Sequence, residues 1–240
     1  MKVLKSQSNY LQLKAKEGKE RGFILITLGG MGVAASFLLI NTLIFLPFFF
    51  ITICLLLWGL SSFQENVNYN RGFVGEDVVS HSLMHLGDEY YLISDIKFSS
   101  NSGNIDHVVL GPNGIFVLET KNYGGTVECV GDEWTKYYDK AHYQKFYEIR
   151  SPSKQVKRNA IIIKKLIEST NILDKSINFW VDGIVVFVDS TLILRLINPT
   201  IPILRPNQLY NYIINRPTKN KFSPQELESM AQMIINRSRM

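Results

Sequence analysis

The sequence predicts an α/β fold, a mixed central sheet flanked by helices, preceded by two transmembrane helices. An uncharged apolar run extends from Gly22 to Leu60. Beyond it, short β-branched runs alternate with longer segments in which apolar residues recur at helical spacing. Because strands that alternate with helices are typical of α/β proteins, we expect one layered domain after the apolar run.

The apolar run is long enough for two crossings of a bilayer. About 20 apolar residues span a membrane as a helix, and residues 22–40 and 43–60 each supply one such segment, with Asn41 and Thr42 at the expected turn. Lys and Arg precede the first span and are absent from the turn, so the positive-inside rule places both ends in the cytoplasm. A cleaved signal peptide is the weaker alternative, because the run has no small-residue cleavage site. The expected organisation in the cell membrane is a basic cytoplasmic tail (1–21), a transmembrane hairpin (22–60), a linker (61–70) and a cytoplasmic domain (71–240).

Basic residues are concentrated at the N-terminus. The chain has 240 residues and a net charge of +5. Residues 1–21 contain six Lys or Arg against two Glu, whereas the remaining residues contain 20 basic and 19 acidic side chains. The chain is therefore not a uniformly basic protein, and its N-terminal lysines are explained most simply as a topology signal.

Several common site classes are missing from the sequence. The two cysteines, Cys54 and Cys129, lie in the apolar run and in the later domain, so we expect neither a disulfide nor a zinc site. His81 and His85 are four residues apart but have no third ligand nearby in sequence, so a metal site is not expected there. The sequence also contains no Gly-rich phosphate loop and no GxSxG elbow. These patterns exclude the common NTPase, serine hydrolase and zinc-protein signatures.

A β-hairpin is predicted at the centre of the later domain. β-branched runs over residues 105–110 and 115–118 flank a Gly-Pro-Asn-Gly sequence, whose residues favour a tight turn. Residues 90–98 are expected to add a third strand in a meander. Apolar runs and helix-start signals predict the other elements. Helices are expected at 72–86, at 151–170, from 207 and at 223–236. Strands that extend the same sheet are expected at 126–130, at Trp134, and at 184–188, 192–196 and 201–204.

Charged side chains are expected to meet at the open end of this hairpin. Glu119 and Lys121 are separated by one residue, so alternation along a strand places them on the same face. Asp106 lies in the first strand, and pairing across the hairpin could bring it beside them. Because buried charges need partners, the two carboxylates suit a hard divalent cation, Mg²⁺ or Mn²⁺. The lysine would then orient or activate a water molecule for attack on phosphorus.

The order of motifs around this hairpin resembles the nuclease-related domain (NERD) family of the PD-(D/E)xK nuclease superfamily. The motifs are a helix with Gly75-Glu76, an Ile-Asp strand with Asp106, a Glu-x-Lys strand followed by Gly124-Gly125, and a later helix with Pro-x-x-Gln that ends at Gln155. The resemblance covers about residues 72–170. It implies a restriction-endonuclease-like fold and metal-dependent hydrolysis of phosphodiester bonds in nucleic acid, DNA more than RNA.

The resemblance also implies a role for each residue. Asp106 and Glu119 would hold Mg²⁺ or Mn²⁺ with support from Glu76, Lys121 would position the water and stabilise the transition state, and Gln155 would assist. On position alone, Glu76 is explained more simply as an acidic residue that interacts favourably with the dipole of its helix. The resemblance therefore implies that Glu76 is an active-site carboxylate, whereas its position in the helix alone does not.

A basic segment follows the hairpin. From Lys136 to Lys165 there are nine Lys or Arg and two acidic residues, which suits a polyanion. Lys154, Lys157 and Arg158 are the candidates for contact with nucleic acid. A solvated helix face next to a basic loop is an equally weighted alternative.

A second interpretation belongs to a different functional class. The chain would be a non-catalytic nucleic-acid-binding or scaffold module tethered to the membrane, with the same fold and no chemistry. The complete set of motifs favours the enzyme, and a response of the Asp106 and Glu119 site to Mg²⁺ would distinguish the two. A homodimer or a larger protein complex is compatible with either interpretation.

Overall fold

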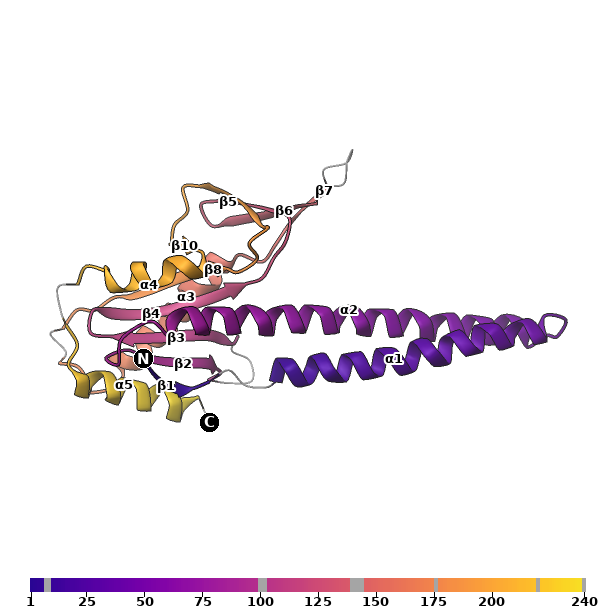
Figure 1. Cartoon of the computed structure of the whole chain (residues 1–240), viewed down its shortest axis with the longest axis horizontal. Helices are drawn as coiled ribbons and strands as arrows, with labels where there is room; N and C mark the ends of the chain where they lie inside the picture. Colours follow the sequence, from indigo (N-terminus) through magenta and orange to yellow (C-terminus); the bar gives the residue numbers. More distant parts are fainter. Residues whose placement is uncertain (7–9, 99–102, 139–144, 175–176, 219–220, 239–240) are drawn as a thin grey trace. The chain divides into compact units, whose positions relative to one another are not determined.

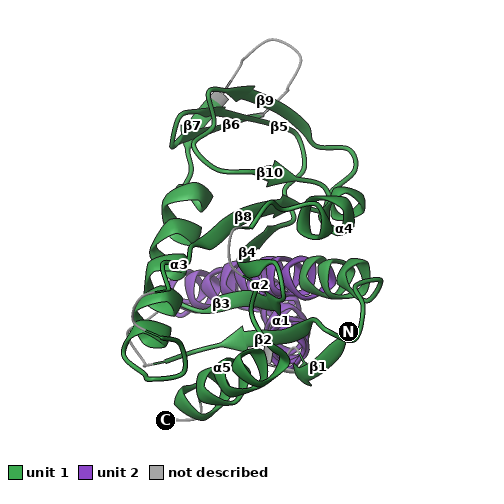
Figure 2. Cartoon of the chain, turned by 90° about the vertical axis from the view of Figure 1, so that its left-hand side faces the viewer, with its two compact units in different colours: residues 1–8, 75–240 green, residues 9–74 purple. Residues whose placement is uncertain are grey.

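The computed structural model describes residues 1–6, 10–98, 103–138, 145–174, 177–218 and 221–238. The chain divides into two compact units, which Figure 2 shows in different colours. Residues 1–8 and 75–240 form one of them, here termed the sheet unit, and residues 9–74 form the other, termed the helical unit.

Two sheets form the framework of the sheet unit. The larger comprises β1 (Lys2–Lys5), β2 (Tyr91–Ile96), β3 (Ile105–Gly111), β4 (Gly114–Lys121), β8 (Val181–Phe187) and β10 (Ile203–Leu204), in the order β1-β2-β3-β4-β8-β10. The smaller comprises β5 (Thr126–Val130), β6 (Glu133–Tyr138), β7 (Lys145–Glu148) and β9 (Ile193–Ile197), in the order β7-β6-β5-β9. In the larger sheet β2, β3 and β4 are antiparallel neighbours, while β8 runs parallel to β4 and to β10. The predicted mixed sheet is confirmed.

Helices cover both faces of the larger sheet (Figure 1). They are α2 (Phe45–Leu83), whose residues from 75 onward belong to the sheet unit, α3 (Pro152–Glu168), α4 (Pro206–Ile214) and α5 (Pro224–Arg237). The end of α2 and α4 pack on one face, against residues such as Phe116 and Leu118. The helices α3 and α5 pack on the other face, against residues such as Ile115 and Val117. The alternation of residues along β4 is therefore what selects the helix that each side chain meets.

The β3–β4 hairpin forms as predicted, with register from His107 opposite Leu118 to Gly111 opposite Gly114. Gly111 is required by close approach, since a Cβ there would lie 2.2 Å from the ring of Tyr90. The Tyr90 hydroxyl donates a hydrogen bond of 2.9 Å to Asn113 Oδ1 in the turn. These contacts fix the turn, and with it the register at the open end of the hairpin.

Not all strands join one sheet, so that part of the prediction is wrong. The strand at Trp134 and the strand over residues 192–196 lie in the smaller sheet as β6 and β9. Gly125 has a φ of +87°, which turns the chain out of the larger sheet after β4. Trp134 of the smaller sheet packs against α3 and the larger sheet. Its indole N–H donates a hydrogen bond of 3.0 Å to Ser153 Oγ of α3, and its ring centroid lies 5.5 Å from that of Phe187 in β8.

Two segments expected to be irregular have regular structure. Residues 2–5 of the expected tail form the edge strand β1, parallel to β2, where flanking lysines are well tolerated. Residues 61–70 of the expected linker are part of α2. No Gly or Pro interrupts the chain between Ser61 and Asn70, so the helix that begins in the apolar run continues through the polar residues.

The helical unit is an antiparallel pair formed by α1 (Tyr10–Ser36), a short 3₁₀ turn (Phe37–Leu39) and the first part of α2. Small residues line its interior: a Cβ added at Gly22 would lie 3.1 Å from the carbonyl oxygen of Gly59, and one at Gly29 only 2.9 Å from the backbone nitrogen of Leu56. Two helices, Gln12–Leu39 and Phe45–Leu83, are long and apolar enough to cross a membrane.

Candidate active site

The open end of the β3–β4 hairpin brings three of the predicted residues together. Asp106 Oδ2 accepts a hydrogen bond of 2.7 Å from the backbone N–H of Thr120. Lys121 Nζ donates a hydrogen bond of 2.6 Å to Glu119 Oε1, within an ion pair that is largely shielded from solvent. Asp106 is thus bonded to the very strand that contains Glu119 and Lys121.

Glu119 is buried because β4 is a central strand. Glu119 pairs with Val185 of β8 on one side, and only 1% of Glu119 is exposed to solvent. Within the described residues, its second oxygen, Oε2, is buried and has no hydrogen-bond partner. A buried carboxylate oxygen without a donor is costly, so this atom is the clearest sign of a ligand site in the sheet unit.

Both carboxyl groups have pKa values above their ordinary range. Burial is the main cause for Asp106, whose pKa is raised well above normal, and the nearby charges of Glu119 and Glu76 raise it further. Burial also raises the pKa of Glu119, against the opposing effects of Lys121, Arg150 and Arg158. Carboxylates that repel one another in this way are stabilised by a cation between them.

Lys121 is held in its protonated form. Burial alone would lower its pKa, but the charges of Glu119, Tyr123 and Asp106 and the hydrogen bond to Glu119 raise the pKa above the ordinary value. At neutral pH this side chain is therefore a cation and a hydrogen-bond donor.

Glu76 is contributed by a different helix from Gln155. It is buried in α2, whose end packs on the face of the sheet opposite α3, whereas Glu119 follows Ile115 and Val117 on the α3 face. Glu76 is close enough to raise the pKa of Asp106. Even so, the described residues contain no group of three His, Cys, Asp or Glu side chains placed to hold a metal ion. The structure therefore brings Asp106 and Glu119 together, and the supporting role of Glu76 stays a prediction.

The helix α3 supplies the remaining predicted residues, and they divide between its sides. Its N-terminus is capped by Ser151, whose Oγ accepts from the backbone N–H of Lys154. Gln155 is half-buried in the following turn, and within the described ranges its side chain makes no hydrogen bond to Asp106 or Glu119. Arg158, by contrast, is within electrostatic range of Glu119.

Lys154 and Lys157 point toward the turn between β5 and β6. Lys154 Nζ lies 2.5 Å from Glu133 Oε1, and Lys157 Nζ lies 2.7 Å from Asp132 Oδ2. Sequence analysis missed Arg150, whose charge also lowers the pKa of Glu119. Its place directly before the Ser151 cap was the signal available, because the start of α3 faces the end of β4.

His107 is part of the packed core, and His81 lies on the surface. His107 is fully buried, with Nδ1 2.9 Å from Ser94 Oγ, and burial lowers its pKa to about 4. His107 is therefore neutral at physiological pH. His81 lies beside Asp77 on an exposed part of α2 and belongs to no metal-binding group among the described residues.

The donor set at Asp106 and Glu119 suits a hard divalent cation. Two carboxylates with raised pKa values, one with a buried oxygen that lacks a donor, are the oxygen ligands that Mg²⁺ and Mn²⁺ prefer. Mg²⁺ is commonly held by only one or two carboxylates and otherwise by water and phosphate, so a third protein ligand is not required.

Comparison with known proteins matches one family model to the part of the chain that contains the carboxylate cluster. Residues 71–188 match the family model described as nuclease-related domain, NERD, and all five predicted site residues lie within that range. An uncharacterized protein of Bacillus anthracis is 30% identical over 109 residues, which are 44% of this chain and 50% of that protein. The chain thus spans about half the length of the curated relative that it matches. No solved structure matches the chain.

Proposed function

Since residues 71–188 match the model of the nuclease-related domain family, we propose that the chain is a membrane-anchored, metal-dependent nuclease that hydrolyses phosphodiester bonds in DNA. The observation that supports this most strongly is the pair of carboxylates at the end of β4, with the unpartnered buried oxygen of Glu119 and a protonated lysine beside it.

Asp106 and Glu119 would hold Mg²⁺ or Mn²⁺. The hydrogen bond from Thr120 occupies Asp106 Oδ2, and the bond from Lys121 occupies Glu119 Oε1. The ligand atoms would then be Asp106 Oδ1 and Glu119 Oε2. A bound cation would neutralise charge on the phosphate and lower the pKa of a coordinated water. Glu76 would add negative charge, since it is close enough to raise the pKa of Asp106.

Lys121 would act as a donor and not as a base. In the reaction, a water oxygen forms a new bond to phosphorus and releases a proton to solvent, one phosphorus–oxygen ester bond breaks, and the departing oxygen takes a proton from solvent. A protonated lysine cannot accept the proton of the attacking water, but it can donate hydrogen bonds to phosphate oxygens as negative charge develops on them. Gln155 and Arg158 on α3 would orient the phosphate.

The helical unit would anchor this nuclease in the membrane. Its two helices have the length and apolarity of membrane spans. Lys14, Lys16, Lys19 and Arg21 precede the first apolar segment, which supports a cytoplasmic N-terminus and, after two crossings, a cytoplasmic nuclease domain.

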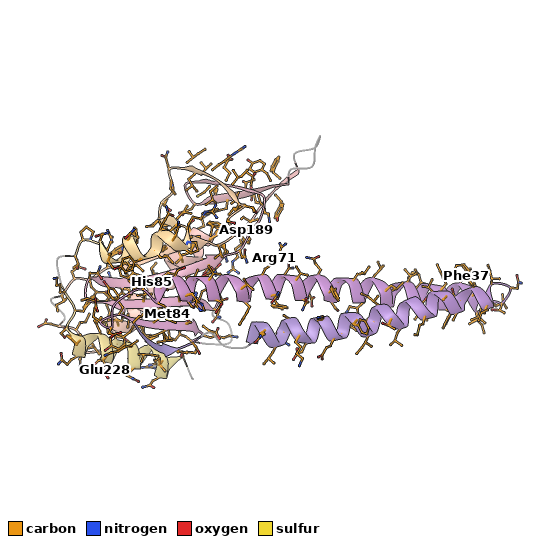
Figure 3. The ribbon with its side chains drawn as sticks, viewed as in Figure 1. Phe37, Arg71, Met84, His85, Asp189 and Glu228 are labelled. Atoms are coloured by element: carbon orange, nitrogen blue, oxygen red, sulfur yellow. The ribbon has the colours of Figure 1, made fainter. Side chains whose placement is uncertain are left out.

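Plasmid cleavage by the full chain in detergent tests the proposal. The protein is incubated with supercoiled plasmid in Mg²⁺, Mn²⁺ or EDTA, and the variants are Asp106→Asn, Glu119→Gln and Lys121→Ala. We expect metal-dependent cleavage that each variant reduces on the order of 10²–10³-fold. Glu228→Gln, an exposed residue of α5 labelled in Figure 3, is the matched control and should cleave normally. Cleavage by Asp106→Asn and Glu119→Gln at the wild-type rate would contradict the assignment.

The second candidate is a non-catalytic nucleic-acid-binding or scaffold module. The ion pair between Lys121 and Glu119 favours it, because this pair already neutralises one carboxylate without a metal. Salt-sensitive DNA binding by a folded chain that cleaves nothing in either metal would support this function over the first.

A further inference from the structure

A cavity lies beside α3, and its lining does not include Asp106, Glu119 or Lys121. It has a volume of about 330 Å³ and lies among Lys157, Ile161 and Lys164 of α3, Trp180 and the loop over residues 200–202. Lys157, Ile161 and Lys164 recur at helical spacing, so they share one side of the helix. None of the residues that line this cavity takes part in the carboxylate cluster.

Trp180 is unusual in its exposure. Its residue is 70% exposed, whereas Trp134 in the same unit is 1% exposed. Trp180 also lines a smaller cavity of about 190 Å³ whose lining includes Arg216. An exposed aromatic side chain that lines two cavities offers a surface on which a planar ligand can stack.

The cavity has a cation that an anionic ligand could use. Lys164 Nζ lies 5.4 Å from the ring centroid of Trp180, and its ion pair with Glu168 is long at 3.7 Å. Such a pair is worth little in solvent, so the ammonium group can turn toward a phosphate. Lys157 is held by Asp132 and Thr200, each at 2.7 Å, and contributes positive potential from a fixed position. The helix as a whole has five Lys or Arg against one Glu.

Trp180 and the carboxylates lie toward opposite ends of β8. Trp180 directly precedes this strand, whereas Val185 pairs with Glu119 and Phe187 pairs with Lys121. At about 3.3 Å per residue, the two sites are on the order of 15–25 Å apart along the sheet. Several consecutive nucleotides cover that distance.

We infer that the Trp180 cavity binds an unpaired base of single-stranded DNA whose backbone continues to Asp106 and Glu119. The base stacks on the indole, and Lys164 contacts an adjoining phosphate. Base–aromatic stacking is tolerant of sequence, so the cavity adds affinity for single strands without selecting a sequence. This inference rests on the proposed nuclease function and assigns it a substrate class.

Binding of a labelled oligonucleotide tests the inference. The full chain in detergent, with EDTA to prevent cleavage, is titrated into fluorescein-labelled oligothymidylate of roughly 10–20 nucleotides. We expect Trp180→Ala to weaken binding about 5- to 150-fold, the range that stacking of one base supplies, and Trp180→Phe to retain most of the affinity. Tyr210→Ala removes a partly exposed aromatic residue of α4 and should bind as the wild type does.

A short substrate separates failure of the inference from failure of the proposed function. A dinucleotide cannot reach both sites, so Trp180→Ala should cleave it at the wild-type rate with Mn²⁺ and show a raised KM only for the long strand. If Trp180→Ala binds and cleaves the long strand normally, the inference is wrong and the nuclease function stands. If the wild-type chain neither binds nor cleaves any strand, both are wrong. A fluorescence response of Trp180 to an acidic peptide but not to DNA would also overturn the inference.

Discussion

The two units place the same kinds of residue in opposite positions. In the sheet unit Phe116 and Phe187 are fully buried, whereas in the helical unit Phe23 and Phe50 are each 68% exposed. Phe37, at the end of the helical pair in Figure 3, is similarly exposed. Exposure of apolar area to water costs about 25 cal/mol per Å². Burial from water therefore explains the sheet unit, while the helical unit has the arrangement expected of helices in lipid, with small residues inside and large ones outside.

Charges follow the same contrast. The sheet unit buries the carboxylates Glu76 and Glu119, and, after burial itself, their charges raise the pKa of Asp106. In the helical unit the described ion pairs, such as that of Arg21 with Glu65, lie outside the apolar segment and are half exposed. The sheet unit thus stores unfavourable electrostatic energy at one place, and the helical unit avoids it. Ionisable groups with shifted pKa values that gather at the end of a central strand identify a candidate functional site.

The largest effect is expected from a glycine inside the helical unit. Gly29→Leu would place side-chain atoms against the backbone of Leu56, at the cost of about 3 kcal/mol or more of packing free energy. Gly30→Leu is the matched control, because nothing lies within 4 Å of a Cβ at Gly30. Both changes gain the same helix propensity. Thermal unfolding in detergent and protease sensitivity should change for Gly29→Leu alone, and equal behaviour of the two variants would refute the close helix packing.

At the carboxylate cluster we expect a substitution that stabilises the fold, by a smaller amount than the glycine substitution destabilises it. Because burial, Glu119 and Glu76 raise the pKa of Asp106, its ionisation opposes folding. The contribution of protonated Asp106 to folding stability is fully present below the pKa that this group has in the unfolded chain. It is lost as the pH rises through the higher pKa that the group has in the folded chain. Asp106→Asn keeps an acceptor for Thr120 and removes the charge. We expect a higher unfolding temperature than the wild type at pH 8, no difference near pH 3, and loss of any cleavage activity.

Calorimetric scans across this pH range measure the difference directly. The matched control is Asp88→Asn, a highly exposed carboxylate at the other end of the sheet unit, which should leave the pH profile unchanged. A destabilised Asp106→Asn at pH 8 would mean that the carboxylate is already neutralised by its neighbours.

Local sequence signals predicted the hairpin and its charged end correctly. The Gly-Pro-Asn-Gly turn sets the register from both sides, and alternation then places Glu119 and Lys121 on one face. The capped start of α5 at Ser223 was equally readable, since its capping box is local. The smaller sheet and β1 were not predictable, because their pairing partners are remote in sequence. The bond of Lys121 to Glu119 and the exposure of Trp180 likewise depend on packing that no local pattern specifies.

The smallest effects are expected from breaking one ion pair in each unit, Asp132 with Lys157 in the sheet unit and Arg21 with Glu65 in the helical unit. Burial alone would raise the pKa of Asp132, but hydrogen bonds from Lys157, Thr200 and Ser153 lower it to about 2. Stability from this group is present above the unfolded pKa near 4 and is lost as pH falls toward 2. After allowance for partial exposure, Asp132→Asn should cost about 1 kcal/mol at pH 7 and nothing near pH 2.

Glu65→Gln breaks the pair with Arg21 in the helical unit, where both side chains are about half exposed. We expect it to cost less than about 0.5 kcal/mol at any pH, as for ordinary surface pairs. Both variants are measured by thermal unfolding in the same detergent. A larger cost for Glu65→Gln than for Asp132→Asn would reverse the comparison. It would place the Arg21–Glu65 pair in a medium of low dielectric, and the apolar boundary of the membrane segment would then extend beyond Leu60 into the polar part of α2.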